Sequence, residues 1–292
     1  MNKKTLLYIL ITYALMWCVF AVFRFTDISY QSFAGVALAS LCMFLPLVAV
    51  LILQAVHHEP LLRGLDVSWK VNRWWFVGWL LMPVVALLTL VVSSWMPGMG
   101  YNPDNEVITQ TLTQISQQTG VALTPNLYIL ITLLSGLFAG ATINALFAFG
   151  EEIGWRGYLL QQFRGKRFLT SAILIGLIWG LWHAPLILLG HNYPQHSVAG
   201  VFMMMLFCAA YTPLILYIRL KSRSVISAAI MHGTLNATAG ISNLLIANFN
   251  DLLCGGPGLA GILVIFTLDI LLFLFDRHIT KDRLFTSPIS EL

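Results

Sequence analysis

The stretch FGEEIGWRGYLL, residues 149–160, places two adjacent carboxylates and an arginine in a segment that otherwise has the composition of a lipid-soluble helix. A charged side chain at the centre of a bilayer costs about 3 kcal/mol or more unless it is paired or hydrated. Glu151, Glu152 and Arg156 therefore need a partner, a water-filled cavity or a chemical role inside the protein.

The surrounding composition identifies a membrane protein. Of the 292 residues, 58% are hydrophobic and 10% are charged, and the mean hydropathy is +0.82. Soluble domains carry about 25% charged residues. The four cysteines have neither metal-site nor disulfide spacing, so we interpret them as free thiols. A net charge of +4 is only weak evidence for binding to nucleic acid, so we expect no nucleic-acid partner.

Apolar segments long enough to cross a bilayer follow one another along the whole chain. They predict an all-α, polytopic membrane protein with about eight transmembrane helices, in one domain over residues 1–292. The first segment follows MNKK and lacks a small-residue cleavage site, so we expect a retained helix and not a signal peptide. The predicted spans are 5–25, 33–56, 74–95, 126–149, 169–190, 198–218, 225–248 and 257–275.

Basic residues orient these spans. Alternate connections hold all but two of the 16 lysines and arginines, the exceptions being Arg24 and Arg156. Cytoplasmic connections of membrane proteins are enriched in Lys and Arg. The pattern predicts that both termini lie in the cytoplasm. The long connection 96–125 then lies outside, and its apolar spacing is compatible with a short amphipathic helix or with a polar loop.

Three predicted spans carry polar residues at compatible depths. Glu151 lies about 20 Å from the basic interface at 1.5 Å per residue, and His183 lies about as deep. His232 and Asn236 follow on the seventh span, roughly 10 and 16 Å from its start. These two residues are four apart, so they share one helical face. The four groups are therefore expected at one level of the bilayer.

The first motif divides into two predicted roles. Glu152 and Arg156 are also four apart, which favours an ion pair along the helix. This pairing leaves Glu151, about 100° around the helix, to face a cavity together with the histidines. Asn144, two turns before Glu151, lies on the same face and is expected to line that cavity.

Three interpretations of this polar set remain at this stage. Single intramembrane His or Asn residues serve as interhelical hydrogen-bonding groups. Carboxylate–histidine chains serve as proton relays in transporters. The same groups also suit hydrolysis, in which a carboxylate and a histidine activate water while other donors stabilise an oxyanion.

The three segments together resemble the CAAX-protease and bacteriocin-processing family of intramembrane proteases, which includes the type II CAAX prenyl endopeptidases. The first motif of that family is Glu-Glu-x-x-x-Arg, here Glu151 to Arg156. The second is Phe-x-x-x-His, here Trp179 to His183 with Trp in place of Phe. The third is His-x-x-x-Asn, here His232 to Asn236. The similarity covers about residues 126–240, which we expect to be the catalytic core.

The resemblance implies about eight transmembrane helices around a conical cavity open to the cytosol and to lipid. It implies an intramembrane endopeptidase in which Glu151 and His183 activate water, and His232 and Asn236 hold the oxyanion. Glu152, Arg156 and Trp179 would support this site.

A zinc-dependent intramembrane metalloprotease is the alternative mechanism, with Glu151, His183 and His232 as the metal ligands. We favour a site without a metal cofactor, because Asn is a poor zinc ligand and a good oxyanion donor. A further alternative, also drawn from the family, is a non-proteolytic membrane protein with a regulatory or bacteriocin-immunity role.

The resemblance also implies the partners and the location. The substrate would be a membrane-associated protein or peptide, and the lipid bilayer is the second partner. The short loops and termini are typical of bacterial members, so we expect the bacterial cytoplasmic (inner) membrane.

Overall fold

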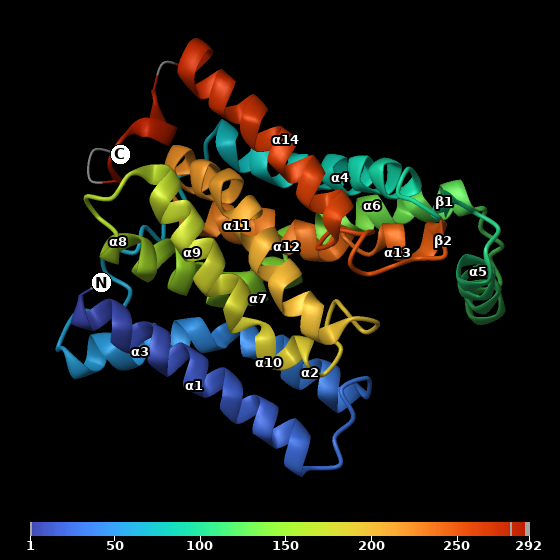
Figure 1. The fold of residues 1–292 in the computed structure, drawn as a ribbon, viewed down its shortest axis with the longest axis horizontal. Coiled ribbons are helices and arrows are strands. Elements are labelled where there is room, and N and C mark those ends of the chain that lie inside the picture. Colours follow the sequence, from blue (N-terminus) through green and yellow to red (C-terminus); the bar gives the residue numbers. More distant parts are fainter. Residues whose placement is uncertain (1, 281, 290–292) are drawn as a thin grey trace.

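A computed structural model describes residues 2–280 and 282–289 of the chain (Figure 1). The predicted all-α class is confirmed, because the two strands are two residues each. The first half contains α1 (Lys3–Phe25), α2 (Phe33–Leu41), the 3₁₀ turn η1 (Cys42–Phe44), α3 (Leu45–Val56), α4 (Arg73–Ser94), β1 (Gly100–Tyr101), α5 (Glu106–Thr119) and α6 (Pro125–Ala141). The second half contains α7 (Ile143–Glu152), the π-helix η2 (Ile153–Leu159), α8 (Leu160–Gln162), α9 (Phe168–Trp182), α10 (Ala184–Ile187), α11 (Ser197–Ser222), α12 (Val225–Thr238), α13 (Ile241–Leu245), β2 (Ile246–Ala247), α14 (Leu259–Phe275), the π-helix η3 (Asp276–Thr280) and the 3₁₀ turn η4 (Leu284–Thr286).

The number of spans differs in detail from the predicted eight. Among the residues that the structure describes, five helical segments are long and apolar enough to cross a membrane, and a bent pair brings the number to six. That pair consists of Pro125–Ala141 and Ile143–Gln162, which meet at 51°. Helix α9 has 15 residues and α12 has 14, so each is shorter than the span predicted for it. The polytopic class is confirmed, whereas the number eight remains a prediction.

Helix α12 lies at the centre of the bundle and carries two of the predicted site residues. It packs against α4, α6, α7 and α11, while α9 lies along α11 (Figure 1). Close approach depends on small residues: a Cβ atom on Gly233 would lie 2.6 Å from the Gly140 carbonyl oxygen. Small residues at helix crossings are the usual way in which membrane helices pack closely.

The bundle has two distinct ends. Helix α1 begins and α14 ends on the left side of the view, where α8 also lies, whereas α5, β1 and β2 lie at the opposite end (Figure 1). Helices α9 and α12 both begin at the α8 end, directly after the basic connections, and run toward the other end. His183 directly follows the last residue of α9, and His232 and Asn236 lie in the second half of α12, so all three are away from the basic connections.

The connection 96–125 contains a helix, α5, in place of a polar loop. Asn105 caps its first turn by accepting a hydrogen bond from the backbone N–H of Ile108, and Gly120 ends it with a positive φ of 72°. Ile108 is buried in a small hydrophobic cluster with residues of α4 and α13. The apolar spacing in this connection thus reflects a helix that packs one face against the bundle.

Candidate active site

Glu151 lies in the last turn of α7, where the helix changes to the π-helix η2. Its side chain is 2% exposed. Its Oε2 atom accepts a hydrogen bond from Trp179 Nε1 at 2.6 Å and a longer one from Trp155 Nε1 at 3.4 Å. A π-helix widens the helical turn and is frequent at functional sites. The two indole N–H groups hold the carboxylate in one orientation at the edge of the cavity.

Glu152 faces away from Glu151 and joins two partners. Arg156 Nη1 donates to Glu152 Oε1 at 3.0 Å, and both side chains are fully buried. His232 Nδ1 lies 2.9 Å from the same oxygen. Arg156 also donates to Thr212 Oγ1 at 3.1 Å, and its guanidinium carbon lies 4.2 Å from the Trp179 ring centre. The pair is thus the expected ion pair, and it also anchors a histidine of the site.

His183 and His232 lie on either side of Trp179. The ring centres are 5.6 Å apart for Trp179 and His183, and 5.3 Å apart for Trp179 and His232. His183 Nδ1 lies 2.9 Å from the Trp179 carbonyl oxygen. Because a carbonyl only accepts, Nδ1 carries the proton, and the lone pair of a neutral ring is then on Nε2. This arrangement makes Nε2 of His183 available as a hydrogen-bond acceptor.

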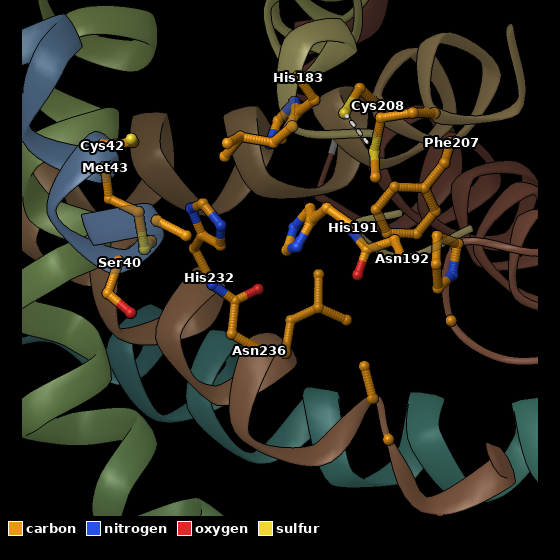
Figure 2. A pocket seen from close by; sticks show the side chains of 18 of the residues that line it. Ser40, Cys42, Met43, His183, His191, Asn192, Phe207, Cys208, His232 and Asn236 are labelled. Atoms are coloured by element: carbon orange, nitrogen blue, oxygen red, sulfur yellow. Dashed lines mark hydrogen bonds between the residues drawn. The ribbon is translucent and has the colours of Figure 1, made fainter. Parts of the chain in front are cut away.

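One cavity of about 520 Å³ collects the four residues predicted to be catalytic. Figure 2 shows His183, His232 and Asn236 around this space. Asn236 is exposed to it, whereas His232 is 4% exposed. Asn144 also lines the cavity, as its helical face predicts. The structure thus brings residues of α7 and α12, and His183 at the end of α9, together around this cavity.

Two features of the cavity were missed from the sequence. His191, in the connection after α10, lines the cavity (Figure 2). Its Nδ1 atom pairs with the hydroxyl of Tyr30. Burial lowers the pKa of His191 to about 4, so its ring is neutral near pH 7. The second feature is the indole hydrogen bond of Trp179, which a Phe at this position could not make. Trp in place of Phe in the second motif was the sequence signal that could have indicated the role of Trp179. No sequence pattern distinguished His191 from an ordinary loop histidine.

The residues proposed for a zinc site do not form a metal-binding group in the structure. Within residues 2–280 and 282–289, no three His, Cys, Asp or Glu side chains are arranged to hold a metal ion. Glu151 is directed to Trp179, and His232 to Glu152. In this arrangement the three side chains predicted as zinc ligands are not directed at one common point, and the site without a metal remains a prediction.

The arrangement has the parts of a hydrolytic site. A buried carboxylate, a histidine with a free Nε2 and an exposed amide face the same cavity. A general base needs to lie within hydrogen-bond reach of the water that it deprotonates, and an oxyanion needs pre-positioned donors. Glu151, His183, His232 and Asn236 are of the residue types that such chemistry requires.

Comparison with known proteins agrees with these three motifs. Residues 126–238 match the family model described as "Type II CAAX prenyl endopeptidase Rce1-like". This segment is similar to the Rce1-like family. The Rce1-like segment contains all three motifs and extends from α6 to the end of α12. The resemblance inferred from the sequence is thereby confirmed.

A curated relative supports the same assignment. The chain is 29% identical, over 167 residues, to a protein from Methanococcus maripaludis named CAAX prenyl protease 2. The matched region is 55% of this chain, and the chain spans about half of the relative's length, 53%. The similarity therefore concerns the Rce1-like segment and its surroundings more than the two proteins as wholes.

Proposed function

We propose that this protein is an intramembrane endopeptidase that hydrolyses a peptide bond of a membrane-associated protein or peptide. The observation that carries the proposal is the meeting of Glu151, His183, His232 and Asn236 at one cavity inside a bundle of apolar helices. The Rce1-like match and the name of the archaeal relative support a protease. The protein acts within the membrane, and both of its termini lie in the cytoplasm.

The proposed reaction begins with a water between Glu151 and the scissile carbonyl. Glu151 takes one proton from the water, and Nε2 of His183 accepts a hydrogen bond from the other. The hydroxide attacks the carbonyl carbon and forms a tetrahedral intermediate. Asn236 donates to its oxyanion through the side-chain amide, and His232 donates through Nε2 as an imidazolium, because its Nδ1–H is bonded to Glu152.

Collapse of the intermediate completes the hydrolysis. The C–N bond breaks, and Glu151 returns its proton to the leaving nitrogen, so that the products are a carboxylic acid and an amine. Trp179 and Trp155 hold the carboxylate in place for both proton transfers. The Glu152–Arg156 pair holds His232 through its Nδ1 atom.

A pair of glutamate variants tests this function. Purified protein in lipid nanodiscs should cleave members of a broad peptide library, and Glu151→Gln should lower the rate by about two to four orders of magnitude, the usual contribution of a general base. Glu106→Gln is the matched control, because Glu106 is an exposed glutamate at the start of α5. Thermal unfolding of both variants should resemble that of the parent protein.

Two outcomes would contradict the proposal. A Glu151→Gln protein that cleaves as fast as the parent would exclude Glu151 as the base. A well-folded parent protein that cleaves no peptide of the library would favour the non-proteolytic regulatory role.

A further inference from the structure

The cavity is closed at the end of the bundle that carries the basic connections. From Glu151, the chain continues toward that end through the residues 152–160, all of which are buried. Trp155 and Arg156 are among the largest fully buried side chains of the protein. Helix α11 is buried over the adjoining stretch 211–219. These side chains fill the space between the site and the basic connections.

The same cavity is open at the other end. Its exposed lining includes Asn192, Asn236, Gly240 and Asn243, which lie at or beyond the far ends of α10 and α12. The site residues and these exposed residues thus form one continuous lining. His191, in the same region, is directed into the cavity beside His232 and Asn236 (Figure 2).

Hydrogen bonds fix the connections around this opening. The hydroxyl of Tyr193 donates to the Pro257 carbonyl oxygen at 2.7 Å. The buried Asp251 accepts from the backbone N–H of Gln195 at 2.7 Å, and its other oxygen lies 2.6 Å from His196 Nδ1. The connections 188–196 and 248–258 therefore form a joined rim around the opening.

The distribution of basic residues distinguishes the two ends of the helical bundle. The connections 26–32, 188–196 and 239–258, at the open end, contain no lysine or arginine. At the closed end, ion pairs link the basic connections to one another: Lys4 with Glu59, Arg219 with Asp66, and Lys221 with Asp282. Basic connections mark the cytoplasmic side. The open end then faces away from the cytoplasm.

We propose that the cavity is loaded from the non-cytoplasmic side of the membrane, by a polypeptide segment that lies outside the cytoplasm. That the loaded segment is a substrate rests on the proposed function. The side of the membrane on which the cavity opens does not depend on the proposed function. The amides of Asn192, Asn236 and Asn243 at the opening suit the backbone N–H and C=O groups of an extended peptide.

Cysteine labelling in intact cells tests the side of the opening. Asn243→Cys places a thiol at the opening, and Lys166→Cys places one in the basic connection between α8 and α9. Both are made with Cys18, the exposed native cysteine, replaced by Ala, and that parent without an added thiol reports background. A charged, membrane-impermeant maleimide should label Asn243→Cys in intact cells and Lys166→Cys only after permeabilisation.

The reverse pattern would overturn the inference, and so would equal labelling of the two variants in intact cells. A second experiment compares peptide cleavage between spheroplasts and inverted vesicles, with the same peptide library added from outside. Spheroplasts should cleave the peptides, and inverted vesicles should cleave them at least tenfold more slowly. Cleavage by inverted vesicles alone would also overturn the inference. Correct labelling with cleavage by neither preparation would reject the proposed function and leave the orientation standing.

Discussion

At the scale of single residues, Trp179 contacts three of the four proposed site residues, Glu151, His183 and His232. Its N–H group donates to Glu151, its carbonyl oxygen accepts from His183, and its ring contacts His232 and Arg156. The motif spacing predicted that an aromatic side chain lies one turn from His183. It could not predict the hydrogen bond to Glu151, because that contact depends on how α9 packs against α7.

Removing only the indole N–H group tests this role. Trp179→Phe keeps an aromatic ring and removes the 2.6 Å donor to Glu151. A hydrogen bond to a charged group contributes about 1.5–3 kcal/mol, so kcat/KM should fall by roughly one to two orders of magnitude. Trp155→Phe is the control, since it removes only the 3.4 Å contact and should have the smaller effect. Equal rates for Trp179→Phe and the parent, or equal losses in the two variants, would contradict this role.

Arg156 gives a prediction about stability. Arg156→Met leaves the fully buried Glu152 without its cationic partner, and stranding one member of a buried pair costs about 3–5 kcal/mol. The unfolding temperature in detergent should fall strongly, whereas Arg164→Met, at an exposed position, should leave it nearly unchanged. Similar unfolding temperatures for the two variants would show that the pair does not hold the bundle together.

At the scale of elements, hydropathy predicted where helices lie better than where they break. The predicted span 126–149 is divided at Thr142, and the predicted span 225–248 ends as a helix at Thr238. Both regions remain apolar past the break, so an average over about 20 residues does not detect it. The bend between α6 and α7 results from packing around α12, which depends on residues far apart in the sequence.

The crossing of α6, α7 and α12 can be tested at Gly233. A Cβ atom there would lie 2.6 Å from the backbone nitrogen of Ala145 and from the Gly140 carbonyl oxygen. Overpacking of this kind costs about 1–3 kcal/mol, so Gly233→Ala should lower the unfolding temperature. Gly100→Ala is the matched control, because a Cβ atom at Gly100 meets no atom within 4 Å. Equal unfolding temperatures would mean that these helices do not need their close contact.

At the scale of the whole molecule, the sequence predicted the all-α membrane class and the order of the helices that carry the polar residues. It did not predict the shape of the cavity. The family resemblance implied an opening to the cytosol, whereas the cavity opens at the end away from the basic connections. That difference became visible only when α7, α9 and α12 were placed together, because the sequence of residues 152–160 does not show that their side chains fill the space beside the site.

The central claim is that Glu151 and His183 activate water without a metal ion. The most direct measurement is the rate of peptide cleavage after exhaustive metal removal, with metal content determined on the same sample. The account predicts that the cleavage rate persists in metal-free protein and is lost in Glu151→Gln. Cleavage that disappears with the metal and returns with stoichiometric zinc would contradict the account, because the ion would then be what supplies hydroxide near neutral pH.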